Sequence, residues 1–302
     1  MKIKELFNRK PVISLEIFPP KPSSPIDTVI STIDALSDLE PDFISVTYGA
    51  GGTSKANTLK IVDIVKNKYN IEALAHLTCI SSTEKDIEDV LGALKESNLE
   101  NILALRGDIP QDENFDLGEE RDFGYAKDLV GFIKEKGDFS IGGACYPEYH
   151  IESTDKLADL RNLKTKVDAG VDFLITQLFF DNNFFYDFKE KLDILGIDIP
   201  ISAGIMPVIN TKQIDRITEL CGAAIPLKFR RILDKYEHNP KALKEAGVAY
   251  ATEQIIDLLS ANVDGIHLYT MNRPEVARGI IKQIDNIRNH FRTEESKKVS
   301  GI

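Results

Sequence analysis

Polar residues able to do acid–base chemistry or to bind a ligand recur at the ends of short apolar runs. In the first run, SLEIFPP, the polar residue is Glu16, and a later run, NILAL, leads directly into Arg106, Gly107 and Asp108. A polar side chain in an apolar strand is costly unless it faces a site or a partner, so the pattern predicts one shared site. The full set is Glu16; Thr47 and Tyr48; His76 and Thr78; Arg106, Gly107 and Asp108; Tyr146, Glu148 and His150; Gln177; and Tyr269, Asn272 and Arg273.

Glu16 and Asp108 are the strongest candidates for a chemical role. Ile17, Phe18 and two prolines follow Glu16, so we expect desolvation to raise the pKa of its carboxyl and make it a proton donor near neutrality. Asp108 follows a glycine, which lets the backbone approach a ligand closely, and its carboxylate could orient a donor of a pterin or flavin ring. The structural alternatives are a salt bridge from Glu16 to a strand-end cation and an ion pair between Asp108 and Arg106.

The histidines and the glycine-rich segment do not match the common metal-binding and phosphate-binding motifs. His76 and His150 could hydrogen-bond a cofactor or be ordinary core histidines, and no two of the five histidines have the spacing of metal ligands, so we predict no metal site. The segment GAGGTS at residues 49–54 fits neither the phosphate-binding pattern GxxxxGKS nor the dinucleotide-binding pattern GxGxxG. A nucleotide cofactor must therefore be held by the side chains at the strand ends.

The apolar runs and the segments between them predict the elements that carry these residues. Segments such as Pro25–Leu39 and Thr58–Tyr69 have helical spacing. Strands that alternate with helices at intervals of about 30 residues pair in parallel, and eight such units predict a (β/α)8 TIM barrel with its site at the carboxyl ends of the strands. The predicted strands are Val12–Ile17, Phe43–Thr47, Ala73–Thr78, Asn101–Leu105, Ser140–Cys145, Asp172–Gln177, Pro200–Gly204 and Gly265–Tyr269.

The chain reads as one barrel domain over residues 1–302. The interval between the seventh and eighth strands is the longest, and it predicts extra helices at Thr211–Leu220, Leu227–Tyr236 and Ala242–Leu259. No linker rich in Pro, Ser or Gly divides the sequence, and the polar tail from about Arg292 is expected to fray.

Composition narrows the class of partner and the compartment. The 302 residues carry 37 Lys and Arg against 48 Asp and Glu, a net charge of -11, which disfavours nucleic acid and membrane surfaces as partners. The amino-terminal stretch is charged where a signal peptide is apolar, and no apolar run approaches the roughly 20 residues that span a bilayer. Cys79, Cys145 and Cys221 form neither a disulfide framework nor a metal-binding pair. We therefore expect a cytoplasmic protein.

An ordered set of motifs covers the chain from about Ile13 to Arg288. The motifs are SLEIFPPK, ISVTYGAGG, AHLTC, NILALRGDIP, ACYPEYH, NLKTKVDAG, FLITQLFFD, GIMPV and LYTMNRPE. As a set, they resemble the methylenetetrahydrofolate reductase family in its short bacterial form. The resemblance implies an FAD-containing barrel that takes a hydride from NADH or NADPH and passes it to methylenetetrahydrofolate by a ping-pong mechanism. The product would be methyltetrahydrofolate, used in one-carbon metabolism and methionine biosynthesis, and we expect a homo-oligomer.

The resemblance also implies roles for single residues. Glu16 looks like the general acid that protonates a folate ring nitrogen, and Asp108 looks like the residue that binds the pterin and tunes the charge of the flavin. Gln177 and Gln213 stand at substrate-contact positions, and Arg273 suits the acidic tail of folate. The residues implied to bind FAD are Thr47, His76, Arg106, Gly107, Asp108, Tyr125, Ala126, Ala144, Tyr146, His150, Asp159, Asn162 and Lys166.

Two departures from the family pattern and two other functions stay open at this point. Thr165 stands where some relatives have an arginine beside the FAD phosphates, so that either Lys166 bears more of that charge or FAD binds more loosely. Ile217 stands where familiar members have a phenylalanine that stacks on the nucleotide or the folate. One alternative function is a folate-binding barrel that transfers a methyl group to a corrinoid protein. The other is a flavoprotein subunit that docks an electron-transfer partner.

Overall fold

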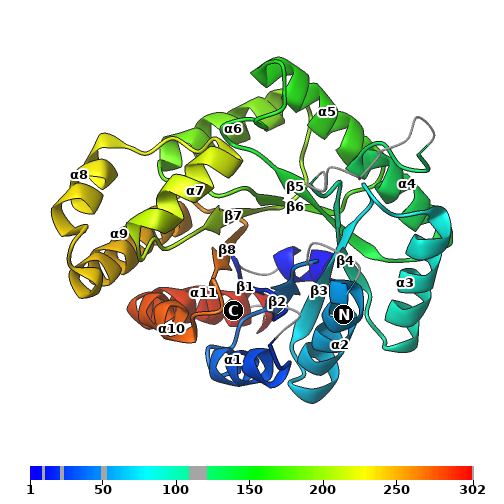
Figure 1. Ribbon diagram of the computed structural model, residues 1–302, viewed down its shortest axis with the longest axis horizontal. Coiled ribbons are helices and arrows are strands. Elements are labelled where there is room, and N and C mark those ends of the chain that lie inside the picture. Colours follow the sequence, from blue (N-terminus) through cyan, green and yellow to red (C-terminus); the bar gives the residue numbers. More distant parts are fainter. Residues whose placement is uncertain (9–10, 21–23, 49–52, 109–120, 301–302) are drawn as a thin grey trace.

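Eight parallel strands form a closed barrel in the computed structural model, which describes residues 1–8, 11–20, 24–48, 53–108 and 121–300 (Figure 1). Each strand pairs with its neighbours in chain order, and β1 closes the barrel against β8. The predicted TIM barrel is thus confirmed. The strands are β1 (Val12–Ile17), β2 (Phe43–Val46), β3 (Glu72–Thr78), β4 (Asn101–Leu105), β5 (Ser140–Cys145), β6 (Phe173–Thr176), β7 (Ile201–Ile205) and β8 (Gly265–Tyr269).

Helices connect the strands and surround the barrel (Figure 1). The three predicted extra helices lie between β7 and β8, together on one side of the molecule. The helices are η1 (Ile3–Asn8), α1 (Asp27–Ser37), α2 (Thr53–Asp63), η2 (Ile64–Lys68), α3 (Glu84–Glu96), α4 (Ala126–Lys136), α5 (Lys156–Asp168), α6 (Asn182–Ile194), α7 (Thr211–Cys221), α8 (Leu227–Tyr236), α9 (Pro240–Ser260), α10 (Pro274–Gln283) and α11 (Asp285–Ser300).

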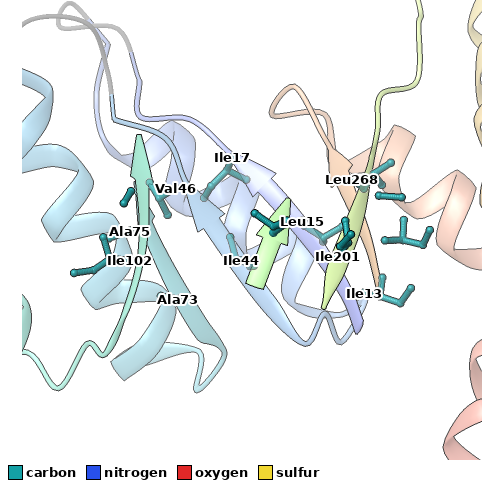
Figure 2. Close-up of a cluster of buried hydrophobic side chains, with 14 of the residues drawn as sticks. Ile13, Leu15, Ile17, Ile44, Val46, Ala73, Ala75, Ile102, Ile201 and Leu268 are labelled. Carbon is teal, nitrogen blue, oxygen red and sulfur yellow. The ribbon is translucent and has the colours of Figure 1, made fainter. Parts of the chain in front are cut away.

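The main core lies between the strands and the helices. On β1 the apolar residues Ile13, Leu15 and Ile17 belong to this core, and Figure 2 shows them beside residues of the neighbouring strands. Because side chains alternate along a strand, Ser14 and Glu16 face the inside of the barrel instead. The strand SLEI therefore supplies the barrel with both its outer packing and its inner polar groups.

The inside of the barrel changes from apolar at its base to polar further up. At the base, Phe43 and Phe173 pack with ring centroids 6.4 Å apart, and Phe7 of η1 packs on Phe173 at 5.5 Å. Above them lie the buried polar side chains of Ser14, Ser45, His76, His267 and Glu16. Since η1 and the aromatic rings fill the base, polar groups inside the barrel face its carboxyl end, where a ligand can enter.

Capping residues fix the starts of the helices that flank the carboxyl end of the barrel. Asp155 caps α5 by accepting a hydrogen bond from the backbone N–H of Ala158 at 2.8 Å, and Thr83 with Asp86 forms a capping box at the start of α3. These caps set the point at which each loop from the barrel becomes a helix.

The ends of a few helices differ from the expected ones. The segment Thr58–Tyr69 is divided between α2 and the π-helical turn η2, and the tail that we expected to fray from Arg292 belongs to α11 up to Ser300. None of the helices in the described ranges is both long and apolar enough to cross a membrane.

Candidate active site

A cavity of about 440 Å³ lies at the carboxyl ends of β4 and β5, between the start of α4 and one face of α5. Nine of the thirteen residues that the family resemblance assigned to FAD line it. The other four, Thr47, His76, Gly107 and Asp108, do not. The nine are Arg106, Tyr125, Ala126, Ala144, Tyr146, His150, Asp159, Asn162 and Lys166.

Charged side chains of both signs line the cavity. Arg106 makes a two-point ion pair with Glu152, with Nη1–Oε2 at 2.5 Å and Nη2–Oε1 at 2.8 Å. Lys166 donates a hydrogen bond to the carbonyl oxygen of Ala144, and desolvation lowers the pKa of its ammonium. Desolvation has the opposite effect on Asp159 and raises the pKa of its carboxyl. Burial in the cavity wall therefore favours the uncharged forms of Lys166 and Asp159, whereas the ion pair with Glu152 favours the charged form of Arg106.

The turn after β4 requires its glycine. Gly107 has a φ of +87°, and a Cβ there would lie 2.9 Å from the Cβ of Thr78. Asp108 follows on the surface of this turn. Because the Arg106 guanidinium pairs with Glu152, the ion pair between Arg106 and Asp108 that we considered as a structural alternative is not formed.

A second polar cluster lies inside the barrel around Glu16. The Oε2 atom of Glu16 accepts a hydrogen bond from Ser45 Oγ at 3.3 Å and lies 3.4 Å from His267 Nε2 and 3.5 Å from His76 Nε2. Ser14 Oγ lies 2.7 Å from His267 Nδ1 and donates to the carbonyl oxygen of Ile266 at 3.2 Å. The carboxylate of Glu16 is thus held by side chains from β2, β3 and β8.

Two hydrogen-bond patterns fit the contacts of His267. The Ser14 hydroxyl lies within hydrogen-bond distance of both the carbonyl oxygen of Ile266 and Nδ1 of His267. In one pattern Nδ1 donates to Ser14, and in the other Ser14 donates to Nδ1 and Nε2 donates to Glu16. The second pattern gives the carboxylate of Glu16 a hydrogen-bond donor from β8.

Our expectation for the pKa of Glu16 is wrong. Burial does raise it, as we argued from the apolar neighbours, but the hydrogen bond from His267 and the nearby His76 lower it by more, and the net pKa lies below its ordinary value. For His76, burial outweighs the attraction of Glu16 and lowers the pKa to about 4. The sequence around Glu16 could not show the two histidines, which come from β3 and β8.

The predicted substrate residues lie at different places around the barrel end. The side-chain oxygen of Gln177 accepts from the N–H of Leu178 at 3.0 Å, just after β6. Arg273 is exposed and lies 3.9 Å from Glu275 at the start of α10. Gln213 is part of α7, and its side chain is outside what the structure describes.

Of the two departures, only one is next to the cavity. Thr165 is exposed and donates to the carbonyl oxygen of Arg161, whereas its neighbour Lys166 lines the cavity. Ile217 packs on an apolar cluster formed by residues after β6 and β7 and by helices α7 to α9.

Sequence reasoning missed several residues of both clusters. Ser14, Ser45 and His267 contact Glu16 or its partners, and Lys127 and Glu152 line the cavity. A usable signal exists for the first three, because each is a polar residue in an otherwise apolar strand. No comparable signal marks Glu152, which lies in a polar loop.

Comparison with known proteins shows the family of this chain. The profile of the family described as methylenetetrahydrofolate reductase matches residues 2–285. The chain belongs to the methylenetetrahydrofolate reductase family. The 5,10-methylenetetrahydrofolate reductase of Pectobacterium carotovorum subsp. carotovorum is 38% identical over 268 residues, which cover 89% of this chain and 88% of the relative. That of Escherichia coli strain K12 is 37% identical with the same coverage.

Plant members of the methylenetetrahydrofolate reductase family match over most of this chain, which spans about half of their length. The probable methylenetetrahydrofolate reductase (NADH) of Oryza sativa subsp. japonica is 37% identical over 297 residues, or 95% of this chain and 49% of the relative. A solved structure described as an uncharacterized protein from Clostridium thermocellum that binds two copies of 5-methyl-5,6,7,8-tetrahydrofolic acid has a TM-score of 0.64 at 16% identity, covering 95% of this chain and all 100% of that one. This likeness supports the barrel fold.

Proposed function

We propose that this chain is a flavin-dependent oxidoreductase that reduces methylenetetrahydrofolate to methyltetrahydrofolate with hydride from NADH or NADPH in a ping-pong reaction. Family membership supports reduction of methylenetetrahydrofolate as the reaction. The observation that carries the cofactor part is the cavity beside β4 and β5, because it gathers nine residues of the FAD set that are far apart in sequence.

The chemistry of the cavity fits a phosphate-bearing flavin nucleotide. Arg106, Lys127 and Lys166 are cationic groups on its wall. The first residues of α4, Ala126 and Lys127, line it as well, and the start of a helix offers backbone N–H groups and partial positive charge to an anion. Bound FAD would supply hydride transfer between the nicotinamide and the folate.

The proposed acid step uses the carboxyl group of Glu16. Opening the one-carbon bridge of the folate requires protonation of a ring nitrogen, and Glu16 is buried but lies at the open side of the polar cluster. When Glu16 releases its proton, the Ser45 hydroxyl at 3.3 Å and the His267 imidazole at 3.4 Å stabilise the carboxylate. In this proposal His267 and Ser45 position the carboxyl of Glu16.

The remaining site residues have proposed roles in binding the folate. Asp108, exposed on the β4 turn, would bind donors of the pterin, and Gln177 and Gln213 would contact the substrate by their amides. Arg273 is 54% exposed, so its guanidinium is accessible to the carboxylates of the folate tail. A cytoplasmic location agrees with Cys79, Cys145 and Cys221 being free thiols, and the homo-oligomer stays a prediction.

The two alternative functions predict different properties. A methyltransferase barrel would need no flavin and would purify colourless. A subunit that mainly docks an electron-transfer partner would oxidise nicotinamide nucleotides poorly on its own. The cationic cavity, separate from the Glu16 cluster, favours a reductase because that reaction needs a cofactor beside the folate.

The visible spectrum of the purified protein tests the proposal. We expect yellow protein with non-covalent FAD, bleaching under anaerobic NADH or NADPH, and recovery of the oxidised spectrum on addition of methylenetetrahydrofolate. A colourless preparation that takes up no FAD on reconstitution would exclude the flavin.

The variant Glu16→Gln tests the acid step separately. The glutamine keeps the size and polarity of the side chain but cannot donate a carboxyl proton. We expect near-normal reduction of the flavin by the nicotinamide nucleotide and a loss of about 100-fold or more in the folate half-reaction. An equal loss in both half-reactions would show that Glu16 is structural.

A further inference from the structure

The ion pair between Arg106 and Glu152 is part of the wall of the cavity that we propose for FAD. Arg106 follows β4, and Glu152 belongs to the loop between β5 and α5. Both residues line the cavity. The guanidinium group that is best suited to a phosphate in this cavity is therefore already engaged at two points by a carboxylate of the same chain.

The two partners differ in how firmly each is held. The side chain of Arg106 is 22% exposed, and its Nε also donates to the carbonyl oxygen of Gly107 at 3.2 Å. The side chain of Glu152 is 52% exposed. Only the backbone of Glu152 is held in place, because its N–H donates to His150 Nδ1 at 3.1 Å. The carboxylate can turn into solvent while the guanidinium keeps its position.

The charges in the cavity favour replacement of the Glu152 carboxylate by a phosphate on Arg106. Arg106, Lys127 and Lys166 are the cations on the cavity wall, and Glu152 and Asp159 are its acids. While Glu152 pairs with Arg106, one of the three cations is neutralised and less of the positive charge of the cavity is available to an anion. A ligand with a diphosphate brings more negative charge than one carboxylate and can bind the same fork of N–H groups.

We propose that Glu152 is a displaceable counterion that holds the Arg106 guanidinium at the cavity wall and yields it to the phosphates of the incoming dinucleotide. The inference rests on the proposed FAD site but assigns a role to a residue outside the FAD set. Glu152 is then a positioning residue that weakens cofactor binding by competing for Arg106.

The test compares Glu152→Gln with the wild-type protein and with Glu135→Gln. Glu135 is an exposed acid of α4 that does not line the cavity, so both variants change the net charge by the same amount. In flavin-free protein, fluorescence quenching gives the affinity for FAD, and calorimetry gives the affinity for ADP, which carries the diphosphate without the flavin ring. Folding of each variant is checked by circular dichroism.

We expect Glu152→Gln to bind FAD and ADP about twofold to fivefold more tightly than wild type, the range for loss of one partly exposed competing ion pair. The affinity of this variant should also fall more steeply between ionic strengths of about 0.01 and 0.15 M, because the cavity is more positive. Glu135→Gln should match wild type in both respects.

Weaker binding by Glu152→Gln, or binding equal to that of Glu135→Gln, would overturn the counterion role. Failure of all three proteins to bind FAD would overturn the proposed function instead. In that case the ADP measurements still decide the counterion role, because an unchanged ADP affinity in Glu152→Gln would refute it independently of the flavin.

Discussion

The Oε2 atom of Glu16 lies within 3.5 Å of Ser45, His267 and His76, all buried inside the barrel. This contact set, rather than the apolar neighbours in sequence, decides the acid strength of the carboxyl. The hydrogen bond from His267 and the nearby His76 lower the pKa of Glu16, and burial lowers the pKa of His76 to about 4.

The pKa of His76 predicts a pH dependence of stability. Between its ordinary value of 6.5 and about 4, the unfolded chain binds a proton that the folded protein does not. The contribution is therefore complete above pH 6.5 and is lost as the pH falls toward 4, with a size of about 3 kcal/mol. Urea denaturation of flavin-free protein between these pH values should give a flatter profile for His76→Gln than for wild type. The exposed His238 supplies the control His238→Gln, which should keep the wild-type slope, and parallel profiles for all three proteins would contradict the prediction.

The position of Asp108 predicts a redox effect without a stability effect. Arg106 pairs with Glu152, so replacing the exposed Asp108 by Asn breaks no ion pair between residues whose side chains the structure describes. The proposed function places Asp108 beside the flavin, and removal of a negative charge there would favour the anionic reduced form. We expect Asp108→Asn to raise the flavin potential and to weaken folate binding by about 10-fold to 150-fold, with an unchanged melting temperature. Redox titration and folate titration measure the two effects; an unshifted potential with intact folate affinity would remove Asp108 from the site.

At the scale of elements, the strands were the most predictable part of the molecule. Four of the predicted strands, among them Val12–Ile17 and Gly265–Tyr269, have the bounds seen in the structure, because apolar β-branched runs between turn residues are specific to buried strands. The contact between Glu16 and His267 was not predictable. It spans 251 positions in sequence and depends on the register of β1 against β8. The pairing of Arg106 with Glu152 likewise depends on the path of a loop, which no periodic pattern describes.

The packing of α9 on the end of β7 predicts an effect of a single methyl group. Gly247 lies in α9, and a Cβ there would be 1.8 Å from the carbonyl oxygen of Val208, which follows β7. We expect Gly247→Ala to destabilise the protein by about 2 kcal/mol or more, because a backbone atom must move. Gly92 in α3 has no atom within 4 Å of its Cβ position, so Gly92→Ala should stabilise the protein by about 0.5–1 kcal/mol. Urea denaturation measures both changes, and a stabilising Gly247→Ala would show that α9 is not packed this closely.

At the scale of the whole molecule, a chain with a net charge of -11 keeps a cluster of cations at one cavity. The cavity joins β4, β5, α4 and α5, which are consecutive elements of the barrel. A ligand bound there would contact several neighbouring barrel units at once. The cofactor proposed for the site should therefore affect the stability of the fold as well as its chemistry.

Binding of the proposed cofactor should stabilise the folded protein. A ligand that binds only the folded protein raises the free energy of unfolding by about 2.7 kcal/mol at 100 times its Kd, so FAD should raise the melting temperature of flavin-free protein by several degrees. Riboflavin has the same ring but no phosphate, and at equal concentration it should give a much smaller shift, because Arg106, Lys127 and the start of α4 then have no anion to bind. Added salt should reduce the FAD shift and leave the riboflavin shift nearly constant, since screening weakens only the charged contacts. Thermal melts monitored by circular dichroism provide the measurement. Equal shifts for the two ligands at low salt would mean that the cavity binds the ring alone and that its cations do not hold the phosphates.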